Sequence, residues 1–250
     1  MSIDNLGDLW AHLSGAQPDP PALIIAATAL VALLVVGVRD VWRVARNAIT
    51  IAHEGGHALA AVLTGRKLTG VRLHSDTSGL TLSRGRPSGP GMAFTLLAGY
   101  VAPSLLGLFG AWLLAGGRIT LLLWLAVALL LAMLVMIRNG YGIVAVLATG
   151  AAVFGVSWFA SPQVQAIFAY AGVWFLLIGG VRPIGELQRL RWRGRLPDSD
   201  ADQLARVTHL PAIVWVALFG IVTVLALAAG GYLLLEPLTN GPLPGWQLVR

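Results

Sequence analysis

The segment His53-Glu54-Gly55-Gly56-His57 contains the residue types and the spacing of a zinc site. On a helix, residues four positions apart lie on the same face, so both histidine rings can reach one cation. Glu54 projects to the same side, where its carboxylate can take a proton from water at the metal. Ionisable residues in apolar segments are costly and usually functional, so we expect a metal site rather than two helix histidines making ordinary hydrogen bonds.

The composition is that of a membrane protein. Of the 250 residues, 57% are hydrophobic and 11% are charged, whereas soluble domains carry about 25% charged residues. The chain contains no cysteine, which excludes disulfides, thiolate metal sites and a cysteine nucleophile. The net charge of +6 comes from Lys and Arg in loops beside apolar segments. We interpret it as a topology signal and not as nucleic-acid binding.

Seven apolar segments approach or exceed the ~20 residues that cross a bilayer, which predicts an all-α polytopic fold with about seven transmembrane helices. They are residues 21–38, 44–63, 92–115, 119–137, 141–160, 164–181 and 210–235. The second is the least apolar, because it contains Arg46, Asn47 and the histidine motif. We expect one membrane domain over residues 21–236, an acidic N-terminal tail over 1–20 and a C-terminal tail over 237–250.

The loop after the histidine motif, residues 64–91, has its own pattern. It begins with Thr64-Gly65, which is a helix-stop signal. Apolar and polar residues then alternate in 71–74 and 80–82, on either side of the polar turn 75–79. This alternation predicts a small β-hairpin directly after the zinc-motif helix.

Counts of Lys and Arg orient the chain. If all seven segments cross and the N-terminus is cytoplasmic, 12 of these residues face the cytoplasm and 5 face outside. We expect this arrangement on the positive-inside rule. If instead the second segment is re-entrant and the N-terminus is outside, the counts are 15 and 2. Both arrangements place residues 64–91 and the basic segment 182–209 on the cytoplasmic side.

A family resemblance follows from these motifs. The helix predicted at residues 49–63, with Gly56 directly before His57, resembles the active-site helix of site-2 protease family intramembrane zinc metalloproteases. The match continues through Thr64-Gly65, the hairpin and Ala98-Gly99-Tyr100, and Ser199-Asp200-Ala201 with Pro211 and Trp215 is similar to the short prokaryotic branch without a PDZ domain. The similarity covers most of residues 45–235.

The resemblance implies a function for each matched residue. It implies that His53 and His57 bind Zn²⁺ and that Glu54 is the general base or acid. The hairpin would resemble the strand that receives an unwound substrate segment by edge pairing. The resemblance also implies a multi-pass protein of the prokaryotic cell membrane.

The third zinc ligand has to be found separately, because hydrolytic zinc sites use three protein ligands plus water. Better-known members supply an Asp from an Asn-Pro-Asp-Gly or Leu-Asp-Gly motif, and neither motif occurs here. The acids and histidines expected on the correct side are His74, Asp76, Glu186, Asp198, Asp200, Asp202 and His209.

Among these residues we favour Asp200. It begins a predicted helix that enters the membrane from the face at which the zinc-motif helix ends, and it lies in the Ser-Asp-Ala match. Asp200 could instead be a plain helix cap, since Ser199-x-x-Asp202 resembles a capping box. Asp202, Asp76 and His74 are the next candidates.

The sequence thus predicts a zinc metalloendopeptidase that cleaves membrane-embedded or juxtamembrane segments of a membrane protein substrate. The expected partners are that substrate and the lipid bilayer, with no nucleic acid. Two other classes stay open. A non-catalytic zinc-binding membrane scaffold would keep the histidines without needing Glu54. A small-solute transporter would be expected to show paired discontinuous repeats, and none is evident in the sequence.

Overall fold

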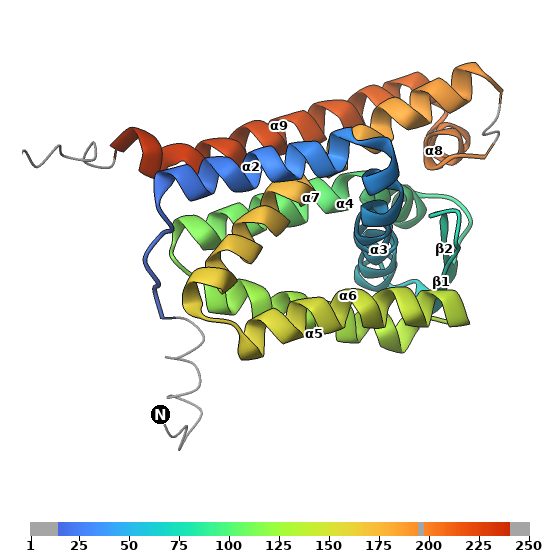
Figure 1. Ribbon diagram of the computed structural model, residues 1–250. Helices are drawn as coiled ribbons and strands as arrows, with labels where there is room; N and C mark the ends of the chain where they lie inside the picture. Colours follow the sequence, from blue (N-terminus) through green and yellow to red (C-terminus); the bar gives the residue numbers. More distant parts are fainter. Residues whose placement is uncertain (1–14, 195–197, 241–250) are drawn as a thin grey trace, which may run out of the picture.

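Helices form most of the chain (Figure 1). The computed structural model describes residues 15–194 and 198–240, and this part contains eight α-helices and one two-stranded sheet. In chain order the elements are α2 (Ala22–Gly37), α3 (Arg39–Leu63), β1 (Lys67–Leu73), β2 (Gly79–Arg84), α4 (Pro90–Ala115), α5 (Ile119–Met136), α6 (Gly140–Phe159), α7 (Pro162–Trp192), α8 (Asp200–Thr208) and α9 (Ala212–Asn240). The expected helical fold with a small hairpin is confirmed, while both predicted tails lie largely outside the described residues.

Within the described chain, five helices are long and apolar enough to cross a membrane: α4, α5, α6, α7 and the Ala212–Glu236 part of α9. Helices α2 and α3 form a pair bent by 102°, and together they count as a sixth candidate. In Figure 1, α2 runs beside α7 and α9, whereas α3 lies across the direction of the other helices at one end of the bundle. The fold is that of a multi-pass membrane protein with five or six candidate spans, fewer than the seven expected.

The count is lower because the second apolar segment does not continue in the direction of the first. Helix α3 carries Arg39, Arg43 and Arg46 in its first turns and the histidine motif further on. In a spanning position these groups would have to be shielded from lipid along the whole helix. Lying across the bundle end, α3 buries Glu54 and His57 while it leaves Arg39 and Arg43 exposed.

This arrangement also bears on the choice between the two topologies. The hairpin and α8 gather at the same end of the bundle as α3 (Figure 1). The chain enters α2 from the opposite end, at which α9 also finishes. The structure therefore favours the alternative in which the second segment does not cross, with 15 Lys and Arg on one side and 2 on the other. That this end is the cytoplasmic one stays a prediction.

The hairpin is fixed to the bundle by the turn between α5 and α6. Strands β1 and β2 pair antiparallel, with a register shift between Leu68 and Gly70. The Asn139 side chain accepts a hydrogen bond from the Leu73 N–H (3.1 Å) and donates one to the Leu73 carbonyl (2.6 Å). The Arg138 N–H donates to the Val71 carbonyl at 2.8 Å. Because a two-stranded hairpin is marginal alone, this anchoring holds the sheet alongside α3.

Cysteine labelling tests the topology, since the native chain contains no cysteine. In Ser88→Cys, in the exposed loop before α4, the thiol should resist an impermeant reagent in intact cells and react after lysis. In Ser161→Cys, before α7, it should react without lysis. Ser2→Cys separates the two models, because the six-span arrangement exposes the N-terminus to the reagent and the seven-span arrangement protects it. External labelling of Ser88→Cys would contradict both.

Candidate metal centre

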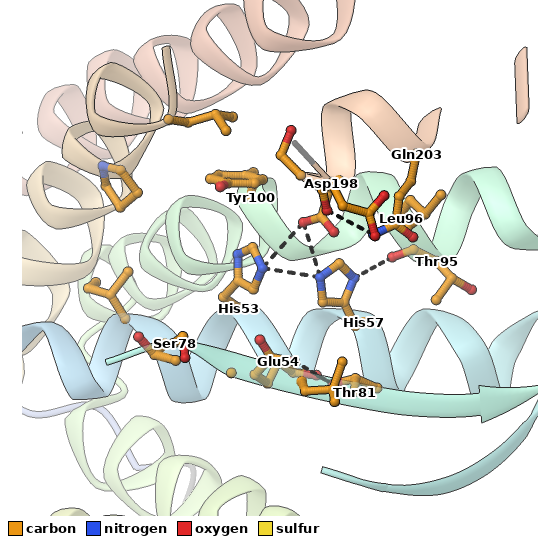
Figure 2. Close-up of a pocket in the computed structure, with 18 of the residues that line it drawn as sticks. His53, Glu54, His57, Ser78, Thr81, Thr95, Leu96, Tyr100, Asp198 and Gln203 are labelled. Carbon is orange, nitrogen blue, oxygen red and sulfur yellow. Dashed lines mark hydrogen bonds and ion pairs between the residues drawn. The ribbon is translucent and has the colours of Figure 1, made fainter. Parts of the chain in front are cut away.

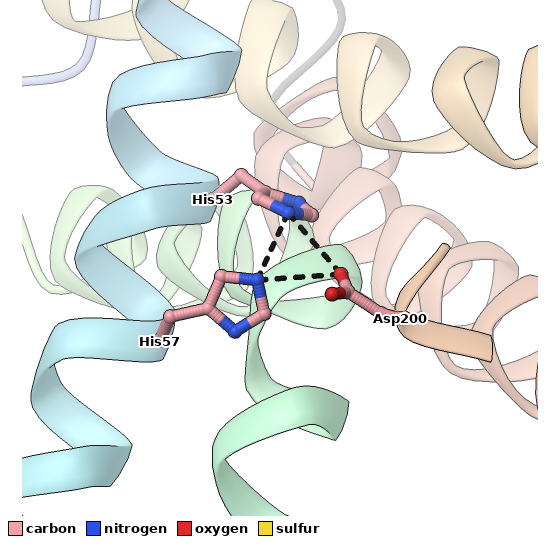
Figure 3. Close-up of side chains that lie close together, drawn as sticks. All are labelled: His53, His57 and Asp200. Atoms are coloured by element: carbon pink, nitrogen blue, oxygen red, sulfur yellow. Dashed lines mark hydrogen bonds and ion pairs between the residues drawn. The ribbon is translucent and has the colours of Figure 1, made fainter. Parts of the chain in front are cut away.

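Side chains from two helices far apart in the sequence converge at the end of the bundle (Figure 3). His53 and His57 lie on α3, one turn apart, and Asp200 is the first residue of α8. The two histidine Nε2 atoms are 3.1 Å apart. Oδ2 of Asp200 lies 3.4 Å from Nε2 of His53 and 3.3 Å from Nε2 of His57. These three atoms could hold one metal ion.

The spacing of the three donor atoms suits tetrahedral zinc. At metal–ligand distances of about 2.0–2.1 Å, neighbouring ligands in a tetrahedron lie about 3.3 Å apart, which is close to the observed separations of 3.1, 3.3 and 3.4 Å. Burial opposes ionisation of Asp200, but charge attraction and hydrogen bonds from His57 and His53 in their protonated forms outweigh it and lower the pKa of this carboxyl. Asp200 therefore presents a carboxylate, and the set leaves a fourth position open, as catalytic zinc sites do.

Asp200 can face the histidines because two of its neighbours cap the helix. Ser199 is the N-cap of α8, and its hydroxyl accepts a hydrogen bond from the Asp202 N–H. The Asp202 carboxylate accepts in return from the Ser199 N–H at 3.2 Å. Burial raises the pKa of Asp202, but bonds from Ser199 and Arg191 outweigh burial and lower it. Ser199 and Asp202 thus cap the helix, and the Asp200 carboxylate is left to face the histidines.

The backbone of α4 sets the protonation of His57. Its Nδ1 lies 2.6 Å from the carbonyl oxygen of Thr95 (Figure 2). Because a carbonyl only accepts hydrogen bonds, Nδ1 carries a proton, and in the neutral ring this tautomer leaves Nε2 with the lone pair that a metal needs. The His53 ring meets the Tyr100 ring edge to face, with centroids 4.8 Å apart. Both imidazoles are therefore held with Nε2 toward Asp200.

The close approach of α4 to α3 depends on two glycines. A Cβ atom at Gly99 would collide with the Nε2 atom of His57 and with the ring of His53. A Cβ atom at Gly56 would collide with Ala102 and with the Ala98 backbone. Gly99 stood in the sequence only as part of a short family match, and the structure supplies its physical reason.

Glu54 lies on the side of α3 that faces β2 (Figure 2), and it lines the same cleft as the three donors. It is 3% exposed, and the Thr81 hydroxyl donates to its Oε2 at 2.6 Å. A Cβ atom at Gly79 would collide with the Glu54 carboxylate, so glycine makes room for it on the strand. Neither Thr81 nor Gly79 was identified from the sequence, because the alternation of the strand does not distinguish them from their neighbours.

These residues line a cleft of about 520 Å³. Its walls come from α3, β2, α4, the C-terminal part of α7 and α8. Figure 2 shows the histidines on one wall, with Thr81 of β2 below them and Gln203 of α8 above. The cleft has room for a peptide segment beside the metal-facing atoms.

The other sequence candidates for the third ligand lie outside this cluster. His74 and Asp76 are at the hairpin tip, where the hydroxyl and N–H of the nearby serine bond to Asp76 and lower its pKa. Glu186 and Asp198 form ion pairs with arginines. His209 ends α8 in a left-handed conformation with φ of 63°. Among the described residues, Asp200 is the acid that joins the two histidines.

A model of the family described as Peptidase M50B-like matches residues 25–230. The chain belongs to this family. The matched range includes the zinc-motif helix, the hairpin and α8, which confirms the resemblance to site-2 proteases. No match was found among curated proteins or solved structures. Membership of the M50B-like family indicates a metallopeptidase, in agreement with the donor cluster at the bundle end.

Gly99→Ala tests the cradle around the two histidines. The added methyl group should displace both rings and lower zinc affinity by about 10- to 100-fold, as loss of outer-shell support does. The measurement is the zinc content of purified protein across a chelator series. Gly172→Ala in α7 is the matched control, because a Cβ atom there meets nothing within 4 Å. Both variants replace glycine with alanine, which has the higher helix propensity. A loss of zinc affinity in Gly99→Ala but not in Gly172→Ala therefore cannot come from helix propensity. Equal zinc affinity in both variants would contradict the cradle.

Proposed function

We propose that this M50B-like protein is an intramembrane zinc metalloendopeptidase that hydrolyses peptide bonds in membrane-embedded or juxtamembrane protein segments. The observation that carries the proposal is the convergence of His53, His57 and Asp200 with Glu54 in one cleft at the bundle end. The family match and the long apolar helices support it. By the resemblance to site-2 proteases, we place the protein in the prokaryotic cell membrane.

In this proposal, His53, His57 and Asp200 hold zinc. A bound zinc ion would polarise the carbonyl of the cleaved bond and lower the pKa of water at the site toward ~7. The carboxylate of Asp200 offsets part of the metal charge, which two neutral imidazoles would leave at +2. The Thr95 carbonyl keeps the His57 tautomer that has Nε2 available.

Glu54 is the proton-transfer group of the proposed reaction. Its carboxylate is held by Thr81 and is not part of the donor cluster, so it is available to accept a proton. It would take the proton of the attacking water and deliver it to the leaving amine. The hydrogen bond from Thr81 restricts the carboxylate to one orientation for both transfers.

The substrate segment is expected to bind as a strand. Within the described chain, β2 pairs with β1 on one edge, and its residues from Gly79 to Ser83 line the cleft. An extended peptide could add to the other edge of β2 and pass the donor cluster. A helical substrate must unwind first, because its peptide bonds are otherwise shielded by hydrogen bonds within the helix.

Glu54→Gln separates a protease from a non-catalytic zinc scaffold. Cleavage of a model transmembrane substrate by the purified protein in lipid vesicles should fall at least about 100-fold, since the general base is lost. Zinc content should stay at the wild-type level, because Glu54 is not a donor. Undiminished turnover would contradict the enzyme proposal. A cellular phenotype that survives Glu54→Gln but is lost in His57→Ala would support the scaffold.

Asp200→Asn tests the third ligand. Ser199 and Asp202 still cap α8, so the helix should remain folded, whereas the neutral amide is a poor ligand. Zinc affinity should fall by more than the roughly 100-fold that losing an outer-shell partner costs. Asp198→Asn is the control, because that residue forms an exposed ion pair with Arg206. Normal zinc affinity in Asp200→Asn would rule this residue out, and Asp202, Asp76 and His74 would be tested next.

A further inference from the structure

A second cavity, of about 530 Å³, lies beside the metal cleft. It is open to solvent and is lined by the first two turns of α3, the hairpin tip and the C-terminal end of α7. Six arginines line it: Arg39, Arg43, Arg46, Arg182, Arg189 and Arg193. Two acids, Asp76 and Glu186, also line it. We call it the arginine cavity.

Two of the six arginines share the single negative charge of Glu186. Its carboxylate pairs with Arg182 at 2.9 Å and with Arg46 at 3.3 Å, and it accepts a hydrogen bond from the Trp42 indole at 3.1 Å. Arg182 also stacks over the Trp42 ring and donates to the Val36 carbonyl at the end of α2. These contacts hold the corner between α2 and α3 against α7. Glu186 therefore has little capacity left to neutralise the other arginines.

The remaining four arginines carry an excess of positive charge. Arg43 pairs with Asp40 at 3.6 Å, in an exposed contact of low strength. Arg39, Arg189 and Arg193 form no ion pair with any described residue. The second acid of the cavity, Asp76, is hydrogen-bonded to Ser78 within the hairpin tip. The cavity is thus suited to an anionic ligand.

The arginine cavity adjoins the metal cleft. Arg46, Thr77 and Glu186 line both spaces. Along α3, Arg46 precedes His53 by two helical turns, or about 10 Å, and Arg43 by about 15 Å. An extended peptide advances about 3.3 Å per residue. If the substrate binds as a strand along β2, its third to fifth residues from the cleaved bond would therefore lie near Arg46 and Arg43.

We propose that the arginine cavity binds acidic side chains of the substrate, three to five residues from the cleaved bond. This inference rests on the proposed endopeptidase function. Such binding would make the protein selective for substrates with an acidic flank. Acidic flanks are uncommon on the cytoplasmic side, because the cytoplasmic flanks of membrane proteins usually carry Lys and Arg. The positive charge of the cavity would also repel basic flanks. Attraction of acidic flanks and repulsion of basic ones would therefore both favour acidic substrates.

A peptide fits the position of the cavity better than a lipid headgroup does. The apolar part of α7 ends near Val181, and Arg189 and Arg193 lie about 12 and 18 Å further along the helix. The headgroup layer adds only about 5–8 Å beyond the hydrocarbon on each side. If α7 runs along the membrane normal, the outer arginines lie past the headgroups, where a juxtamembrane peptide can reach them.

The test compares two model substrates in purified full-length protein in vesicles. They share one transmembrane segment and differ by Asp or Asn at the third to fifth residues on each side of the cleaved bond. Wild-type protein should prefer the Asp substrate by about tenfold in kcat/KM, as a few partly exposed ion pairs would give. In Arg189→Gln/Arg193→Gln this ratio should fall toward one. In Arg72→Gln/Arg84→Gln it should persist, because those exposed arginines line neither cavity.

A charge reversal keeps the test independent of folding losses. Arg189→Glu/Arg193→Glu leaves four arginines and four acids in the cavity, so the kcat/KM ratio of the Lys-flanked to the Asp-flanked substrate should rise above its wild-type value. A misfolded variant would slow both substrates without raising that ratio. Glu54-dependent cleavage with a wild-type Asp/Asn ratio near one would overturn this inference and leave the proposed function standing. Failure to cleave any substrate would count against the proposed function and the inference together.

The same assay identifies a lipid ligand. It is run in phosphatidylcholine vesicles and in vesicles that also contain phosphatidylglycerol. If Arg189→Gln/Arg193→Gln slows both substrates equally, and only with phosphatidylglycerol present, the cavity binds a lipid headgroup and the inference is overturned. A ratio that depends on the substrate in both vesicle types supports the acidic-flank subsite.

Discussion

The two histidines of the candidate metal centre lie on α3, a helix too polar to be a candidate span by itself, and the rest of the fold depends on how that helix is shielded. Helix α3 turns by 102° away from α2 and lies across the bundle end. Helix α4 covers its histidine face, at a distance that Gly56 and Gly99 permit. The hairpin covers the face that carries Glu54, and the α5–α6 turn holds the hairpin through Asn139. An apolar bundle thereby presents a polar site at one end without exposing it to hydrocarbon.

Charge balance in this site accounts for the capping box at the N-terminus of α8. A dication held by two neutral imidazoles in a partly buried site needs a nearby anion. Asp200 can provide it only if its carboxylate does not satisfy the N–H groups of its own helix. Ser199 and Asp202 satisfy those groups through the capping box, and Arg191 neutralises Asp202. The short helix therefore has one acid for its own stability and one that faces the two histidines of the candidate metal centre.

The parts of this structure that depend on local sequence were predictable. The histidine motif, the apolar helices and the alternation around the hairpin each produce a pattern within a few residues. The sequence offered a re-entrant second segment as one of two topologies but could not choose it, because a helix lying across the bundle end has the length of a span and hydropathy does not record direction. The roles of Thr81, Gly79 and Gly99 depend on close approach between segments far apart in the chain. Asp200 could be shortlisted by elimination, but its separation from the capping role required the geometry of α8.

One ion-pair network links the position of α3 to both cavities. Glu186 of α7 binds Arg46 and Trp42 of α3, while Arg182 reaches the carbonyl at the end of α2. Single exposed ion pairs contribute little, but a network that shares one carboxylate restrains several side chains at once. The Arg46–Glu186 pair also lines both the metal cleft and the arginine cavity.

An acidic substrate residue near Arg46 would add a second anion to this network and hold α3 more firmly against α7. Binding in the arginine cavity would then also help to keep the zinc-motif helix in place.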